Sequence, residues 1–216
     1  MRQQVKDFAP ISLMSRAPYL LYINPSIPAK SVRELIALAK AHPGKLNFGA
    51  GLPGSGTNFI SVWFLSLANI KATYVPYKGV AQAVIDVVAG QIDAGFSTAV
   101  PLLPHLKSGR LRALGISTAQ RSTLFPDIPP IAEQGLPGFD ASTFHGWSAP
   151  AGTPPAIINK LSLELARIAK LPDVIESLRA DNSEPVGSTP EQFRQFIAAE
   201  VPRWRKLVQD SGITVD

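Results

Sequence analysis

Short apolar runs alternate with helix-type patterns through the first 116 residues, and this alternation constrains the fold more than any other feature. Strands separated by helices of this length are typical of βαβ units and a parallel sheet. The predicted strands are Ile11–Ser15, Tyr19–Ile23, Lys45–Phe48, Ala72–Val75, Gln91–Phe96 and Leu111–Ile116, and the predicted helices begin at Ser31, Thr57, Val80 and Pro101. We therefore predict an α/β fold with a mostly parallel sheet.

The pattern changes at Pro126. Seven prolines fall within residues 126–155, and this density favours a crossing segment over a packed element. Three helical patterns follow, Pro155–Lys170, Pro172–Ala180 and a third from the cap residue Thr189 to about Asp210. Three helices with hardly a strand cannot easily build an α/β core of their own. We expect them to cover a sheet that this sequence does not obviously contain.

The composition is that of a globular protein and excludes several kinds of site. Hydrophobic residues make up 45% and charged residues 17% of the 216 residues. The absence of cysteine excludes disulfides, thiolate nucleophiles and Cys-ligated metals. The three histidines are isolated in sequence, and no two carboxylates are paired for acid–base chemistry. We predict no metal site, no catalytic residues and no enzymatic activity.

The net charge of +5 conceals an asymmetry between the two parts of the chain. Residues 1–121 carry 13 Lys/Arg and 4 Asp/Glu, or +9, whereas residues 122–216 carry 8 and 12, or −4. The basic residues are scattered singly, without interleaved aromatics, so nucleic acid is not a predicted partner. Residues 35–85 contain no Asp or Glu, and this stretch would attract an acidic ligand.

Neither a membrane span nor a leader is predicted. The longest apolar run, Phe59–Ile70, is too short and too interrupted to cross a bilayer. The first fourteen residues have no clean apolar core or small-residue cleavage site, so we expect no signal peptide in the chain as written.

Residues 47–59 read NFGAGLPGSGTNF, and Gly49–Gly54 matches the G-x-G-x-x-G pattern of dinucleotide sites. A dinucleotide site needs an acidic residue about 20 positions further on, but none occurs before Asp86, and Pro53 removes a backbone N–H. No nicotinamide or flavin cofactor is therefore predicted. A ligand-free strand-to-helix turn is one alternative. We favour a carboxylate site in which backbone N–H groups and two hydroxyls meet at a helix N-terminus. The residues of that site are Gly51, Gly54, Ser55, Gly56 and Thr57.

Seven short motifs, in order, resemble one family over essentially the whole chain. They are Asp7-Phe-Ala-Pro-Ile11, Asn24-Pro-Ser-Ile-Pro28, Val75-Pro-Tyr-Lys-Gly79, Gly90-Gln-Ile-Asp93, Leu111-Arg-Ala-Leu114, Gly135-Leu-Pro-Gly138 and Ala149-Pro-Ala-Gly-Thr-Pro154. The chain resembles the Bug, or TctC-like, extracytoplasmic solute receptors of tripartite tricarboxylate transporters. The resemblance implies a periplasmic binding protein of type II-like fold, in which two lobes close on a small carboxylate. It also implies the membrane components of a transporter as partners.

The resemblance assigns ligand residues in three segments. Residues 49–57 resemble the second-lobe ligand loop. Residues 96–98 occupy the position after a strand where relatives line the cleft. Relatives commonly have Asp-Asn there, whereas this chain has two hydroxyl residues. Residues 142–145 resemble a Ser-Ser-Trp-Phe segment at the return crossing between the lobes; for His145, a structural role is an equal alternative. The predicted ligand residues are Ala50, Gly51, Gly54, Ser55, Gly56, Thr57, Ser97, Thr98, Phe144 and His145. Aromatic acids would gain from Phe96 and Phe144 if those rings face the cleft.

The resemblance also implies that part of the first lobe is missing. Relatives begin with a signal peptide and a first-lobe βαβ stretch that carries a Pro-Gly-Gly ligand loop, and this chain starts at the crossing strand that follows. We therefore expect an N-terminally truncated receptor, with residues 1–9 starting a crossing segment, 10–145 forming a complete ligand-binding lobe, and 146–216 forming the return crossing and the helices of an incomplete lobe. Apolar stripes left uncovered on those helices predict a homo-oligomer with weak carboxylate binding. The alternatives are a nucleotide-dependent oxidoreductase and a self-associating fragment that binds no ligand.

Overall fold

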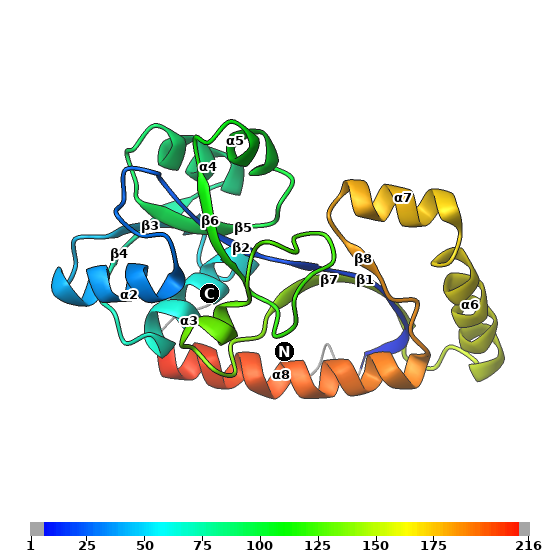
Figure 1. Ribbon diagram of the computed structural model, residues 1–216. Helices are drawn as coiled ribbons and strands as arrows, with labels where there is room; N and C mark the ends of the chain where they lie inside the picture. Colours follow the sequence, from blue (N-terminus) through cyan, green and yellow to red (C-terminus); the bar gives the residue numbers. More distant parts are fainter. Residues whose placement is uncertain (1–6, 212–216) are drawn as a thin grey trace. The chain divides into compact units, whose positions relative to one another are not determined.

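The computed structural model describes residues 7–211, which divide into two compact units (Figure 1). Of the described residues, unit 1 contains 7–17 and 143–206, and unit 2 contains 18–142 and 207–211. None of the helices in this described part is long and apolar enough to cross a bilayer. Of the predicted crossing start at residues 1–9, residues 1–6 lie outside the described residues.

Unit 2 is built on a five-stranded sheet of strand order β4-β3-β5-β2-β6. The strands are β2 (Leu20–Ile23), β3 (Asn47–Gly51), β4 (Thr73–Tyr77), β5 (Ala94–Ser97) and β6 (Arg112–Ile116). Strand β3 pairs in parallel with β4 and β5, whereas β2 is antiparallel to both β5 and β6. Strands β3, β4, β5 and β6 therefore point the same way, in agreement with the prediction of a mostly parallel sheet, and β2 is the exception. The chain enters this unit at the edge where the other four strands end, so β2 runs against them.

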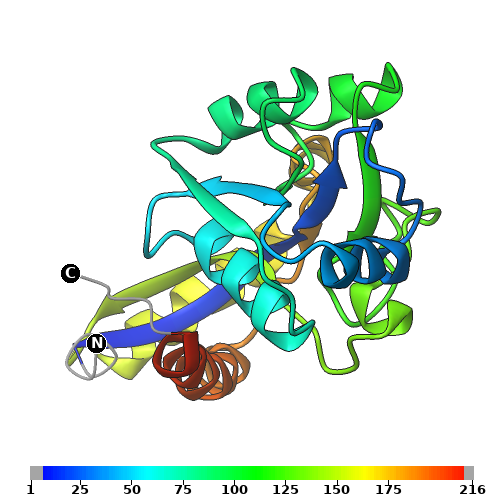
Figure 2. The same ribbon diagram turned by 90° about the vertical axis from the view of Figure 1, so that its left-hand side faces the viewer.

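Helices cover both faces of this sheet, with α4 and α5 on one side and α2 and α3 on the other (Figures 1 and 2). They are α2 (Val32–Ala41), α3 (Gly56–Leu67), α4 (Val80–Val88) and α5 (Leu103–Lys107), followed by a short 3-10 helix, η1 (Ile131–Gln134). Leu20 and Tyr22 point from β2 into the apolar cluster beneath α4. An aromatic cluster formed by Phe48, Phe64, Phe96 and Phe139 joins β3, α3, β5 and the loop after η1. Phe96 is fully buried there, so its ring is a core group.

Unit 1 contains a three-stranded sheet of order β7-β1-β8 and three helices. Its elements are β1 (Phe8–Pro18), β7 (Ser142–Pro150), α6 (Pro155–Ile168), α7 (Pro172–Ala180), β8 (Glu184–Pro185) and α8 (Pro190–Ser211), the last residues of α8 belonging to unit 2. The prediction that residues 126–155 form a crossing segment and not a packed element is wrong for β7, which pairs within a sheet. Its partner β1 lies far away in sequence, and the two meet where Ala151 N–H donates to Asp7 O at 2.8 Å.

The apolar core of unit 1 is small. Ile11, Ala149 and Ile158 form a buried cluster, against which Leu165 packs. On α6, however, Ile157 is 49% exposed, Leu161 43% and Leu163 73%. The apolar stripe expected on this helix consists of Ile157, Ile158, Leu161, Leu165 and Ile168. Its member Ile158 belongs to the buried cluster and Leu165 packs against that cluster, whereas Ile157 and Leu161 are exposed.

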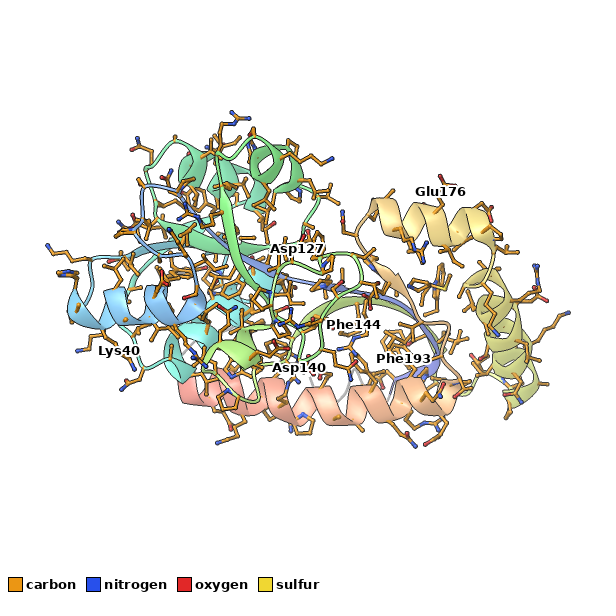
Figure 3. All side chains as sticks on the ribbon, in the orientation of Figure 1. Lys40, Asp127, Asp140, Phe144, Glu176 and Phe193 are labelled. Carbon is orange, nitrogen blue, oxygen red and sulfur yellow. The ribbon has the colours of Figure 1, made fainter. Side chains whose placement is uncertain are left out.

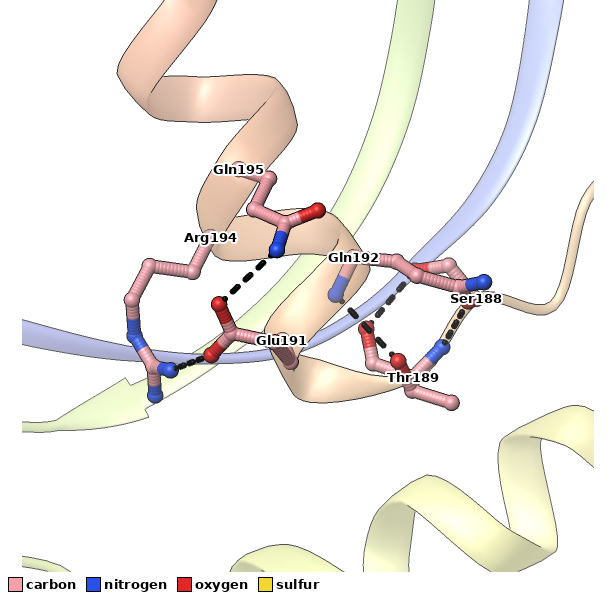
Figure 4. A network of polar contacts seen from close by, with 6 residues as sticks. All are labelled: Ser188, Thr189, Glu191, Gln192, Arg194 and Gln195. Atoms are coloured by element: carbon pink, nitrogen blue, oxygen red, sulfur yellow. Dashed lines mark hydrogen bonds and ion pairs between the residues drawn. The ribbon is translucent and has the colours of Figure 1, made fainter.

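The start of α8 is held by a reciprocal cap (Figure 4). Gln192 N–H donates to Thr189 Oγ1 at 3.2 Å, and Thr189 N–H donates to Gln192 Oε1 at 2.9 Å. The residue before this cap, Ser188, accepts from Leu13 N–H at 2.9 Å through its hydroxyl oxygen. These bonds tie the predicted N-cap of the third C-terminal helix to the central strand of unit 1.

Candidate functional site

The glycine-rich loop lies at the edge of the unit 2 sheet where β3, β4, β5 and β6 end. The parallel pairing of β3 with β4 and β5 brings their carboxyl ends to this edge, and the pairing Leu20↔Ser97 brings the start of β2 there too. In open α/β sheets, ligands bind in loops just outside the carboxyl ends of the strands. The topology therefore places the predicted carboxylate loop at a suitable edge of the sheet.

The backbone N–H groups of the first half of this loop are bonded within the protein. Gly51 N–H donates to Thr57 Oγ1 at 3.0 Å, and Gly54 N–H donates to Asn58 Oδ1 at 3.1 Å. Ser55 N–H donates to Leu52 O at 3.0 Å. The expectation that Gly51 and Gly54 offer free N–H groups to a ligand is therefore wrong. Folding uses those donors to shape the loop.

The donors that remain lie in the first turn of α3. Ser55 is the N-cap of this twelve-residue helix, and its hydroxyl oxygen accepts from Asn58 N–H at 3.3 Å. Within the described part of the chain, the N–H groups of Gly56 and Thr57 have no hydrogen-bond partner, as is usual for the first residues of a helix. The hydroxyl oxygens of Ser55 and Thr57 lie 3.4 Å apart. Two amides and two hydroxyls thus converge at the positive end of a helix dipole.

Gly56 is needed at the first position of α3 for lack of space. A Cβ atom at this position would collide with the hydroxyl of Tyr19, the residue just before β2. The backbone of Tyr19 is itself fixed by Ser117 Oγ, which accepts from Tyr19 N–H at 2.8 Å. Gly56 is exposed, so its backbone faces solvent at the helix terminus.

The other predicted residues of unit 2 differ in their accessibility. Ala50 is fully buried on β3, where only its backbone could take part in binding. Ser97 is also fully buried, and its Oγ has no hydrogen-bond partner among the described residues. Thr98, the next residue, is half-buried at the end of β5. The structure therefore brings Ser97 and Thr98 to the same sheet edge as the loop, with only Thr98 partly exposed.

Phe144 and His145 lie on β7, in unit 1. The Phe144 ring packs edge-on against Phe196 with centroids 4.9 Å apart, and Phe193 lies beyond it at 6.5 Å (Figure 3). The Nδ1 atom of His145 lies 3.3 Å from Ser15 Oγ on β1. These contacts give both side chains structural partners within their own unit.

Two residues that support the loop were not singled out from the sequence. Asn58 accepts from Gly54 N–H, and the Tyr74 hydroxyl donates to Gly51 O from the neighbouring strand β4. Asn58 follows the cap by three residues, a spacing that could have indicated its role, whereas no local pattern connects Tyr74 with a loop 23 residues earlier. In the part of the chain that the structure describes, no three His, Asp or Glu side chains are grouped so as to hold a metal ion.

Comparison with known proteins supplies the family. The family model described as "Tripartite tricarboxylate transporter family receptor" matches residues 2–213. The chain belongs to this receptor family. The predicted recognition is confirmed, and membership of a family of receptors agrees with the prediction that the chain is not an enzyme.

Among the curated relatives, protein BugT of Bordetella pertussis is 36% identical over 208 residues, which are 96% of this chain and 64% of BugT. A Pseudomonas relative is 32% identical over 95% of this chain and 62% of its own length. The chain thus spans slightly less than two thirds of these receptor-family relatives.

Solved structures of similar proteins confirm the mixed α/β fold of periplasmic binding proteins. An R. palustris protein solved with adipate is 31% identical, with a TM-score of 0.83 over 97% of this chain and 70% of that protein. MatC from Rhodopseudomonas palustris, solved with bound malate, is 30% identical, with a TM-score of 0.79 over 94% of this chain and 70% of MatC. The periplasmic binding protein BugD agrees in fold at 24% identity, with a TM-score of 0.80.

Proposed function

We propose that this chain is part of an extracytoplasmic solute receptor that binds a small carboxylate for a tripartite tricarboxylate transporter. One observation carries the proposal: the free amides of Gly56 and Thr57 converge with the hydroxyls of Ser55 and Thr57 at the N-terminus of α3. Partial positive charge at a helix N-terminus, together with unpaired N–H donors, favours an anion.

The donor set suits a carboxylate bound without a dedicated cation. Amide and hydroxyl groups can donate to both oxygens of one carboxylate, and such charge-assisted hydrogen bonds are stronger than neutral ones. No acidic residue occurs between Glu34 and Asp86, so the sequence around the loop adds no repulsive charge. Of the four lysines in the same stretch, Lys78 follows the end of β4 and so adds positive charge at the carboxyl edge of the sheet.

Within the predicted set of dicarboxylates, tricarboxylates and aromatic acids, we favour an aliphatic acid. Phe96, one of the two rings expected to favour an aromatic ligand, is a buried core residue. Phe144 is engaged edge-on with Phe196. The relatives solved with adipate and malate hold aliphatic dicarboxylates.

A ligand screen tests this function. The purified chain would be titrated with adipate, malate, citrate, benzoate and NAD, with thermal shift and calorimetry as readouts. We expect saturable binding of an aliphatic acid and no response to NAD. Saturable binding of NAD without any acid binding would instead support the oxidoreductase alternative, and no binding by any compound would support the non-binding fragment.

We further propose a periplasmic location, membrane components of the transporter as partners, and self-association of this chain. The first two rest on membership of the receptor family. Self-association rests on Ile157 and Leu161, whose exposed apolar side chains share one face of α6. Pairing of two copies would remove this surface from water.

A further inference from the structure

Tyr74 lies on β4, and its side chain bonds to the loop that follows the neighbouring parallel strand β3. On β4 it stands in register with Phe48 on β3, yet its hydroxyl donates to the carbonyl oxygen of Gly51, where β3 becomes the loop. The Tyr74 side chain therefore reaches along the sheet toward the carboxyl edge. Its ring is half-buried, so the position of the hydroxyl is restricted by packing.

The same hydroxyl lies beside Asn58, in the first turn of α3. Burial raises the pKa of Tyr74, and a hydrogen bond with the Asn58 side chain acts in the opposite direction. Asn58 is itself 3% exposed and accepts from Gly54 N–H at 3.1 Å. Tyr74 thus bonds to the carbonyl of Gly51, where the loop begins, and it interacts with Asn58, the residue in α3 that accepts from Gly54 N–H.

The hydrogen bonds of this network restrict the backbone of the loop at Gly51 and Gly54. Gly51 and Gly54 are the residues whose backbone would otherwise be the most mobile, since glycine has the widest range of conformations. Gly54 adopts a positive φ of 86°, which makes its orientation especially dependent on the bond to Asn58. A loop ordered before the ligand arrives loses less conformational entropy on binding.

We propose that Tyr74 is a positioning residue of the receptor: its hydroxyl orders residues 51–57 so that the free donors of Gly56 and Thr57 face a carboxylate in advance of binding. This inference rests on the proposed function, because it concerns the same loop. Tyr74 does not itself touch the ligand. Its contribution is a smaller entropic cost of binding.

Strand β4 supplies a matched control. Tyr77 lies three residues further along and therefore on the opposite face of the sheet, where its hydroxyl donates to Asp86 Oδ2 on α4 at 2.7 Å. Tyr74→Phe and Tyr77→Phe each remove one buried or half-buried hydroxyl that donates to one acceptor. Only the first of these hydroxyls belongs to the loop network.

The experiment combines hydrogen exchange with calorimetry on the full chain. We expect Tyr74→Phe to accelerate amide exchange in residues 50–58 of the ligand-free protein, and Tyr77→Phe to leave that segment unchanged. In titrations with adipate and malate, Tyr74→Phe should weaken binding by about three- to ten-fold, and the loss should appear in the entropy of binding. Tyr77→Phe should bind both acids with nearly the affinity of the wild type. With saturating ligand, exchange in the segment should return to the wild-type rate.

Two results would overturn the inference while leaving the proposed function intact: equal affinities of the two variants, or faster loop exchange in Tyr74→Phe without weaker binding. A loss of thermal stability with unchanged loop exchange would show a general structural role and would also overturn it. If the wild-type chain takes up neither acid, the proposed function fails first and the positioning role fails with it. The wild-type titration therefore separates the two failures.

Discussion

At the scale of single residues, the loop after β3 depends on hydroxyl groups that serve the protein and leave a donor for a ligand. Thr57 Oγ1 accepts from Gly51 N–H, and Ser55 Oγ accepts from Asn58 N–H. Each oxygen therefore accepts one backbone N–H. The two hydroxyls also bond to each other at 3.4 Å, so one O–H is used between them and the other can donate to a ligand.

Replacing both hydroxyls tests their share in binding. Ser55→Ala combined with Thr57→Ala should weaken carboxylate binding by about 1–3 kcal/mol, because hydrogen bonds to a charged group are lost. Calorimetric titration with adipate and malate measures the change. Thr73→Ala is the control, since the Thr73 hydroxyl donates to Gly44 O at the start of β4, near the opposite edge of the sheet. Unchanged affinity in the double variant would remove this loop from the site.

A second residue-scale prediction concerns alkaline pH. Burial, the hydrogen bond to Asp86 and the charge of Asp86 raise the pKa of Tyr77 to about 12. The ordinary tyrosine value is near 10, so the folded protein holds this proton more tightly than the unfolded chain. The resulting stabilisation is fully present below about pH 10 and is lost as the pH rises through about 12.

Urea unfolding of the wild type and of Tyr77→Phe, at several pH values from 8 to about 12, measures this linkage. The difference in unfolding free energy between the two proteins should be constant at the lower values and should shrink toward the upper end. A difference that stays constant over the whole range would show that Tyr77 titrates normally.

At the scale of elements, helix α8 illustrates how a local pattern becomes a tertiary contact. The Thr189–Gln192 box satisfies two backbone N–H groups within the element. Ser188 then joins the start of α8 to β1 through bonds to Leu13 and Ser12. The cap therefore orients a helix and also fixes where that helix leaves the sheet of unit 1.

Removing this cap should lower stability by a predictable amount. Thr189→Ala is expected to cost about 1 kcal/mol of unfolding free energy, within the range of about 0.5–2 kcal/mol known for N-caps. Thr189→Ser keeps the accepting oxygen and should lose much less. Urea unfolding of the three proteins gives the comparison, and an equal loss in both variants would attribute the effect to the threonine methyl group.

At the scale of the whole molecule, the two units differ in how many apolar side chains their own helices and strands bury. Unit 2 encloses its sheet between two helical layers, with eleven buried residues in the cluster beneath α4 alone. The buried cluster at α6 in unit 1 has three residues, and α7 contributes no buried residue. Unit 1 is consequently the part expected to gain from contact with a second chain.

We expect the 23.1 kDa chain to form dimers or larger assemblies at micromolar concentration, measured by size-exclusion chromatography with light scattering. Ile157→Lys with Leu161→Lys places charge on one exposed face of α6, since the two residues are four apart, and should shift the population toward monomer. Ile85→Lys, an equally exposed site on α4 of unit 2, is the control. A wild-type chain that is a monodisperse monomer would contradict the proposed self-association.

Most elements were predictable because their signals are local. Ser31 caps α2 by accepting from Glu34 N–H, and Thr189 caps α8 in the same way from Gln192 N–H. The apolar patterns of α3, α4 and α6 likewise lie within the helices that they specify. The glycine pattern likewise located a strand-to-helix turn, and the ordered family motifs identified the receptor family. Short-range sequence signals are sufficient to specify these features.

Other features depend on contacts between segments that are distant in the chain, so no local pattern could indicate them. Strand β7 exists through pairing with β1, and β2 is antiparallel because it meets β5 and β6 at the edge where the chain enters the sheet. The burial of Phe96 follows from packing against three other rings. The free amides of the glycine loop also follow from the folded geometry and not from the composition of the loop. Folding bonds the N–H groups of Gly51, Gly54 and Ser55 to acceptors on Thr57, Asn58 and Leu52, and it leaves the N–H groups of Gly56 and Thr57 without a partner among the described residues.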